Sequence, residues 1–193
     1  MACYALLAVR PPGEGKSRLA GALSDAAREA LNYSMFRHIL GVTREVILPA
    51  HIIVVSRSEA LLDEARAAGC HAEPEHGDGL NQALSQAGRA AVDRGAAELL
   101  SLSSDLPFLG AEDIATMFAA RGDVVIATDR LHIGTNALLM RQPFAIPFSY
   151  GLGSLAAHLA AAEKAGLKAT VVDSPGLARD IDTPADLAEL SAG

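Results

Sequence analysis

Strand-like and helix-like segments alternate along nearly the whole of this 193-residue chain, and no other feature limits its fold so strongly. Short apolar or β-branched runs predict strands, and longer runs with apolar residues at helical spacing predict helices. The expected strands cover residues 5–9, 52–56, 71–74, 99–103, 123–128, 137–140 and 169–173. The expected helices cover residues 27–46, 59–68, 80–94, 111–120, 154–165 and 184–190. This alternation predicts an α/β fold of three layers, in which helices cover both faces of a mostly parallel sheet.

The length of the chain predicts one domain, residues 1–193, with a substantial core. Half of the residues are hydrophobic, but no apolar run approaches the about 18 residues that span a bilayer. Cys3 and Cys70 lack metal-ligand spacing and suit a reducing compartment, so we expect a cytoplasmic protein. The net charge of −7 argues against a general nucleic-acid binder. A local cluster of Lys and Arg would still suffice to bind one nucleotide.

A loop rich in cations directly follows the first expected strand. Arg10, Lys16 and Arg18 lie in this loop together with two glycines. The run Gly15-Lys16-Ser17 invites interpretation as a P-loop, but that motif needs a glycine five residues before Gly15, where this chain has Arg10. A dinucleotide-binding glycine pattern is excluded too, because its third glycine would be Arg18. Three cations suit a triphosphate, and a solvated loop is the alternative that the sequence leaves open.

Three aspartates follow the ends of expected strands. Asp105 comes after the strand at 99–103, while Asp180 and Asp182 are separated by one residue, so that in extended chain both side chains point to one side. Ligands of such sheets bind beyond the carboxyl ends of the strands. Close carboxylates repel each other unless a cation lies between them, and oxygen ligands suit a divalent metal ion. The alternatives are that Asp105 is a turn residue and that Asp182 only supports the helix start at 184.

Small and hydroxyl residues form two further candidate sites. Ser154 opens an expected helix whose N-terminal amides favour a phosphate or a carboxylate, and Gly151 lets the backbone approach such a group. Thr135 supplies a hydroxyl without adding charge, and Asn81 could read a base edge or a ribose. Ordinary capping and turn formation are the alternatives for both the 151–154 segment and Asn81. The six histidines share no spacing, so none is interpreted as a metal ligand or general base, and His158 is interpreted as structural.

In their order along the chain, these motifs resemble the 2-phospho-L-lactate guanylyltransferase family, at residues 16–19, 79–81, 104–107, 134–138, 151–154 and 180–184. The family also includes phosphoenolpyruvate guanylyltransferases, which serve the biosynthesis of coenzyme F(420). The resemblance covers essentially the whole chain. It implies a Rossmann-like nucleotidyltransferase fold of the nucleotide-diphospho-sugar transferase type.

The resemblance also implies an activity and its residues. GMP would pass from GTP to the phosphate of 2-phospho-L-lactate, phosphoenolpyruvate or 3-phosphoglycerate, with release of pyrophosphate. Mg²⁺ would be held by Asp105, Asp180 and Asp182, and the phospho-acid by Thr135, Gly151 and Ser154. The nucleotide would be bound by Arg10, Lys16, Arg18, Gly79 and Asn81. Lys16, Arg18 and Asp105 would act in catalysis.

Two other functions remain open at this point. One is nucleotidyl transfer to another acceptor, such as a sugar phosphate or a molybdopterin-type cofactor. The other is a nucleotide-binding regulator that has lost turnover, although such a protein has no need for all three aspartates. Neither a nucleic acid nor a membrane is an expected partner, and the sequence leaves a homodimer open.

Overall fold

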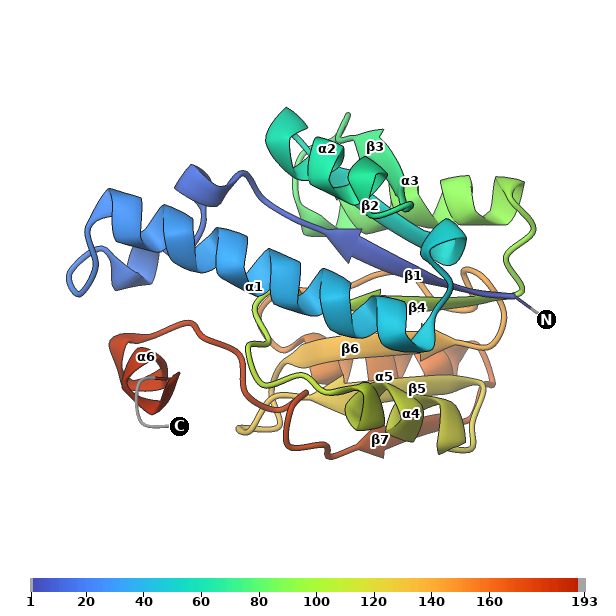
Figure 1. Ribbon diagram of the computed structural model, residues 1–193. Coiled ribbons are helices and arrows are strands. Elements are labelled where there is room, and N and C mark those ends of the chain that lie inside the picture. Colours follow the sequence, from blue (N-terminus) through green and yellow to red (C-terminus); the bar gives the residue numbers. More distant parts are fainter. Residues whose placement is uncertain (1, 191–193) are drawn as a thin grey trace.

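The computed structural model describes residues 2–190, whose strands form one seven-stranded sheet (Figure 1). The strands are β1 (Cys3–Ala8), β2 (Ile52–Ser56), β3 (His71–Pro74), β4 (Glu98–Leu102), β5 (Val124–Thr128), β6 (Thr135–Met140) and β7 (Ala169–Val172). Their order in the sheet is β3-β2-β1-β4-β6-β5-β7. Only β6 runs antiparallel to its neighbours, so the predicted mostly parallel sheet is confirmed.

Helices pack on both faces of this sheet (Figure 1). One face is covered by α1 (Asp25–Val46), α2 (Glu59–Ala67) and α4 (Ala111–Ala119), and the other by α3 (Leu80–Asp93) and α5 (Ser154–Lys164). A short helix, α6 (Pro184–Leu190), lies beyond the end of the sheet. The predicted three layers are therefore present. Among the described helices, none combines the length and the apolarity that a membrane crossing requires.

Burial on both faces explains the composition of the strands. Every residue of β2 is buried, and its side chains alternate between the two cores: Ile52 and Val54 pack on one face, Ile53 and Val55 on the other. Only the second half of α1 is buried. Its buried residues begin at Met35, because the first turns of α1 extend past the ends of the strands (Figure 1).

The reversed direction of β6 brings its first residues to the end of the sheet at which the parallel strands finish. The parallel strands all finish at this end, and an antiparallel strand begins where they finish. The loop 129–134 joins β5 to β6 as a hairpin, with Thr128 opposite Thr135. Asp129 closes this loop by accepting hydrogen bonds from the N–H groups of Ile133 (2.8 Å) and Gly134 (3.0 Å).

Candidate active site

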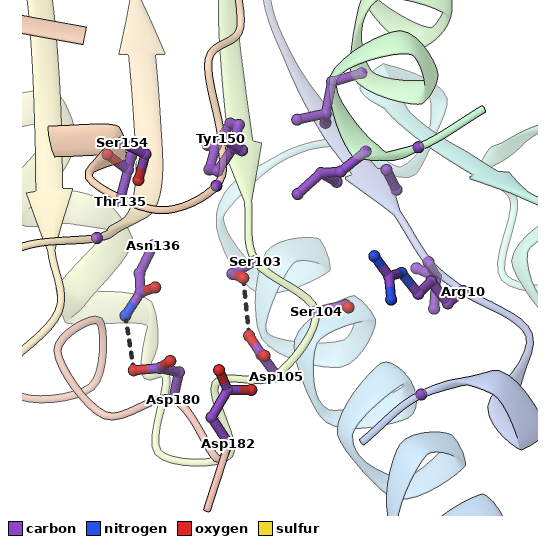
Figure 2. Close-up of a pocket in the computed structure, with 18 of the residues that line it drawn as sticks. Arg10, Ser103, Ser104, Asp105, Thr135, Asn136, Tyr150, Ser154, Asp180 and Asp182 are labelled. Atoms are coloured by element: carbon purple, nitrogen blue, oxygen red, sulfur yellow. Dashed lines mark hydrogen bonds between the residues drawn. The ribbon is translucent and has the colours of Figure 1, made fainter. Parts of the chain in front are cut away.

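A cavity of about 860 Å³ opens at the carboxyl ends of the parallel strands (Figure 2). Its wall is built from the loops after β1 and β4, the start of α3, the start of β6, the segment before α5, and residues 180–182. All but one of the predicted site residues line it: Arg10, Lys16, Arg18, Gly79, Asp105, Thr135, Gly151, Ser154, Asp180 and Asp182. The exception is Asn81.

The three predicted metal ligands converge. Asp105, Asp180 and Asp182 each offer a carboxylate oxygen, and these oxygens lie within 4.8 Å of one another. A backbone hydrogen bond from Ile181 N to Asp105 O (3.1 Å) ties the two loops together. Because Ile181 is buried between the two aspartates of its loop, both carboxylates face the cavity, as alternation in extended chain predicts.

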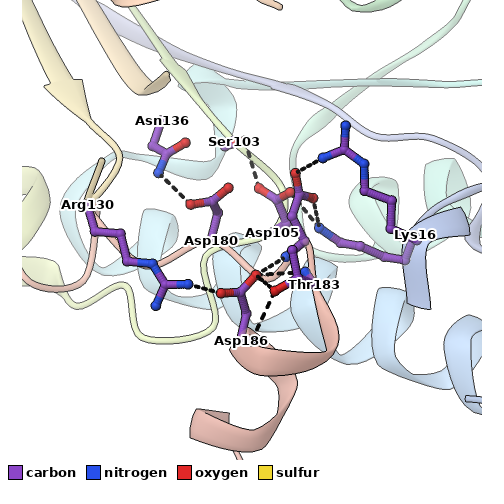
Figure 3. A network of polar contacts seen from close by, with 10 residues as sticks. Lys16, Ser103, Asp105, Arg130, Asn136, Asp180, Thr183 and Asp186 are labelled. Atoms are coloured by element: carbon purple, nitrogen blue, oxygen red, sulfur yellow. Dashed lines mark hydrogen bonds and ion pairs between the residues drawn. The ribbon is translucent and has the colours of Figure 1, made fainter. Parts of the chain in front are cut away.

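Lys16 lies against this cluster (Figure 3). Its Nζ atom is 2.6 Å from Oδ2 of Asp105 and 3.2 Å from Oδ1 of Asp182, and only 8% of its side chain is exposed. Burial alone would lower the pKa of Lys16, but the two carboxylates outweigh this effect and raise the pKa. Arg18 is 3.6 Å from Asp182 with most of its side chain exposed. Thus Lys16, one of the predicted phosphate ligands, is paired with two carboxylates of the cluster.

Asp180 has the least compensated charge of the cluster. Burial raises its pKa, and the nearby Asp105 raises it further, although a hydrogen bond of 3.3 Å from Asn136 acts in the opposite direction. A cation among the three carboxylates would relieve this repulsion. Carboxylate oxygens are the ligands that hard divalent cations prefer, so the donor set fits Mg²⁺.

The cap of α6 fixes the position of the second aspartate loop. Thr183 and Asp186 form a capping box: Asp186 Oδ2 accepts from Thr183 N at 2.7 Å, and Asp186 N donates to Thr183 Oγ1 at 3.4 Å. The same oxygen accepts from Asp182 N at 3.0 Å, and Arg130 pairs with the other oxygen. Burial alone would raise the pKa of Asp186, but these hydrogen bonds and Arg130 hold it below its usual value.

We expect Asp186→Asn to lower the free energy of unfolding by about 1–2 kcal/mol at pH 7, the usual cost of losing a helix cap. Because the folded-state pKa is depressed, the stabilisation is present above the unfolded value of about 3.9 and is lost as the pH falls through the folded value. Urea unfolding of both proteins from pH 7 to pH 3 measures the difference, which should shrink towards acid. Glu189→Gln, which alters the exposed partner of Arg130, should cost less than about 0.5 kcal/mol.

The acceptor wall, formed by the residues predicted to hold the phospho-acid (Thr135, Gly151 and Ser154), lies across the cavity from the cationic loop. In Figure 2, Thr135 and Ser154 lie on one side of the aspartates and Arg10 on the other. Gly151 (φ 134°) and Gly153 (φ 70°) adopt conformations that side chains rarely reach, which explains the glycines. The amides of Ser154 and Leu155 donate to backbone carbonyls, so the hydroxyls of Thr135 and Ser154 are the more available donors here.

The family is decided by comparison with known sequences. Residues 3–192 match the sequence model described as "Guanylyl transferase CofC like". The chain belongs to this family. As a CofC-like guanylyl transferase, it is a nucleotidyltransferase, in agreement with the resemblance in its motifs.

Named relatives of this CofC-like transferase differ in acceptor. It is 39% identical to a phosphoenolpyruvate guanylyltransferase of Rubrobacter xylanophilus, in an alignment covering 100% of this chain and 95% of the relative. It is 33% identical to a 3-phospho-D-glycerate guanylyltransferase of Colwellia psychrerythraea, with 94% and 88% covered.

Solved structures confirm the nucleotidyltransferase fold of the CofC-like chain. A putative nucleotide-diphospho-sugar transferase from Desulfovibrio desulfuricans G20 superposes with a TM-score of 0.78 at 19% identity, covering 98% of this chain and 87% of that one. The 4-diphosphocytidyl-2C-methyl-D-erythritol synthase of Anaerococcus prevotii superposes with a TM-score of 0.61 at 15% identity, with 98% and 95% covered.

Asn81, predicted as a nucleotide ligand, contacts Tyr150 in this CofC-like transferase. Its side chain donates to Tyr150 O (3.0 Å) and accepts from Tyr150 N (2.7 Å), and Gly79 and Leu80 line the cavity nearby.

Two other residues that matter to the site, Tyr150 and Asn136, were not predicted. Tyr150 itself was missed, although its position directly before Gly151 is a signal. Asn136, which contacts Asp180, stands in the Gly-Thr-Asn motif but was not assigned a role.

Proposed function

We propose that this protein transfers GMP from GTP to the phosphate of a small phosphorylated three-carbon acid and releases pyrophosphate. The observation that carries the proposal is the convergence of three carboxylates between a cationic loop and a wall of hydroxyl donors (Figure 2). Two negatively charged reactants repel each other, so a site that brings them together must neutralise their charge where they meet.

The cavity has room for both reactants. Its volume of about 860 Å³ lies in the upper part of the roughly 300–1,000 Å³ range of small-molecule sites. Arg10 and Arg18 extend from the loop after β1 and can bind the triphosphate without fixed geometry. Thr135 and Ser154, on the opposite side, would hold the phosphate of the acceptor, with Gly151 allowing a close approach of backbone.

The proposed reaction needs no general base. The nucleophile is a phosphate oxygen of the acceptor, and because the second pKa of a phosphate monoester is about 6, this group is largely ionised at pH 7. Bound Mg²⁺, held by Asp105, Asp180 and Asp182, would stabilise negative charge that develops at the α-phosphoryl group. Lys16 brings an ammonium to the same point and, with Arg18, stabilises the leaving pyrophosphate.

The names of the relatives support the identity of the reactants. Guanine as the base, and phosphoenolpyruvate or 3-phospho-D-glycerate as the acceptor, are taken from the names of the Rubrobacter and Colwellia proteins. The family resemblance adds 2-phospho-L-lactate as a candidate acceptor and coenzyme F(420) biosynthesis as the pathway.

Pyrophosphate release tests the proposal. We expect GTP, but not ATP, CTP or UTP, to support release in the presence of at least one of phosphoenolpyruvate, 2-phospho-L-lactate and 3-phospho-D-glycerate. Removing divalent cations with EDTA should abolish release, and added Mg²⁺ should restore it. Release with glucose 1-phosphate and with none of the acids would refute the acceptor class, and nucleotide binding without turnover would indicate a regulator.

A further inference from the structure

His158 of α5 is completely buried, yet both of its ring nitrogens have polar contacts. Nε2 accepts a hydrogen bond of 3.0 Å from the backbone N–H of Ser149. Nδ1 lies 3.0 Å from Oγ1 of Thr135, which is part of the cavity wall. One imidazole thus connects the start of β6 with the segment that leads into α5.

These contacts determine where the ring carries its proton. A backbone N–H can only donate, so Nε2 must be unprotonated. Burial lowers the pKa of His158 to about 4, so the ring is neutral at pH 7 and its single proton lies on Nδ1. The Nδ1–H group therefore donates to Oγ1 of Thr135.

The direction of this bond decides what Thr135 can offer a ligand. A threonine hydroxyl has one proton and two acceptor sites. Here an acceptor site is taken by His158, and within residues 2–190 no further partner of this hydroxyl is recorded, so its proton remains available to a group in the cavity. A donor attracts an anion, whereas a lone pair facing the cavity would repel it.

We infer that His158 is a positioning residue that makes the Thr135 hydroxyl a donor towards the acceptor phosphate. This inference rests on the proposed function. It assigns His158 no contact with substrate and no part in proton transfer.

The second contact of His158, with the backbone of Ser149, holds the segment that leads to Gly151. Ser149, held by Nε2, precedes Tyr150, whose ring stands edge-on to the imidazole with centroids 5.2 Å apart. Tyr150 is also held through its backbone by Asn81 and through its hydroxyl by Ser101 at 2.6 Å. Because this segment leads directly to Gly151, the ring, together with Asn81 and Ser101, sets the distance between Thr135 and Gly151.

The protonation of the ring can be measured in the intact protein. ¹⁵N-labelled histidine side chains in wild-type protein, assigned by comparison with His158→Asn, should show His158 as the Nδ1–H form between pH 6 and pH 8. An Nε2–H form or an imidazolium over this range would overturn the inference. This measurement needs no turnover, so it stands even if the proposed reaction is not found.

Kinetics test whether the ring acts through Thr135. With the best of the three acids as acceptor, His158→Phe should raise the KM for that acid about tenfold, the effect of misdirecting one hydrogen bond to a charged group, and should leave the KM for GTP within about twofold. In a Thr135→Val background the same change should have little further effect. His158→Asn, whose amide can replace Nδ1–H, should recover most of the affinity.

A control and two contradicting outcomes complete the experiment. His51→Phe alters a histidine that stacks on Tyr4 at the opposite end of the sheet, and it should change neither KM. Additive effects of His158→Phe and Thr135→Val, or an equal rise in the KM for GTP, would show that His158 has only a general structural role. If His158→Phe does not fold, the wild-type spectrum still decides whether the Nδ1–H group of His158 faces Thr135.

Discussion

Asp105→Asn should lower the rate of guanylyl transfer about a thousandfold, which corresponds to about 4 kcal/mol of lost transition-state stabilisation. Asp105 stands where the loops after β4 and β7 meet, and it contacts both Ser103 (2.8 Å) and Lys16. The asparagine keeps the size of the side chain but removes a charge from the cluster. A metal ion and the lysine would then both be held more weakly at the point where the two substrates meet.

Single-turnover pyrophosphate release over a range of Mg²⁺ concentrations would measure this effect. The free energy of unfolding should fall by no more than about 1 kcal/mol, because loss of one carboxylate also relieves repulsion with Asp180. Asp93→Asn, an exposed substitution at the end of α3, is the matched control and should leave the rate unchanged. Near-normal turnover of Asp105→Asn would refute its assignment to the reaction centre.

Lys16→Met should lower kcat about a hundredfold and should make stability depend on metal. Lys16 is the buried cation of the aspartate cluster. Without it, the carboxylates lose their neutralising partner, and we expect a loss of about 1–2 kcal/mol in unfolding free energy in EDTA, limited by the partial exposure of Asp182. Because Mg²⁺ can replace the ammonium, millimolar Mg²⁺ should restore most of the loss.

Thermal unfolding with and without Mg²⁺ separates the two roles of this lysine. The increase in Tm on adding Mg²⁺ should be larger for Lys16→Met than for the wild-type protein, and smaller for Asp105→Asn. Lys164→Met, at the exposed end of α5, should behave like the wild type. An identical response of all four proteins would mean that the three carboxylates do not bind the metal.

The sequence predicted the elements well because the spacing of apolar residues and the capping patterns are local properties. The start of α6 is an example, since Thr183 and Asp186 lie within one turn and carry their capping pattern in the sequence. The direction of β6 could not be predicted in this way. All six of its residues are buried, so its composition is the same whichever way the strand runs.

The contacts inside the site were less predictable because they join distant segments. Three aspartates at strand ends suggested a cluster, but the backbone bond between Ile181 and Asp105 depends on how the chain returns from the edge strand β7. The pairing of Asn81 with Tyr150 spans 69 positions and has no local signal. Lys16 was expected at a phosphate, and only the arrangement in space shows that Asp105 and Asp182 are its partners.

The hairpin loop 129–134 contributes Asp129, Ile133 and Gly134 to the cavity wall. Both of its ends enter adjacent strands of the central sheet, and Asp129 closes it with two short-range bonds. Substitutions in this stretch that spare Arg130, the partner of Asp186 beside the second aspartate loop, need not rethread the chain. Grafting the corresponding hairpin between relatives named for different acids would test whether this loop influences the proposed acceptor.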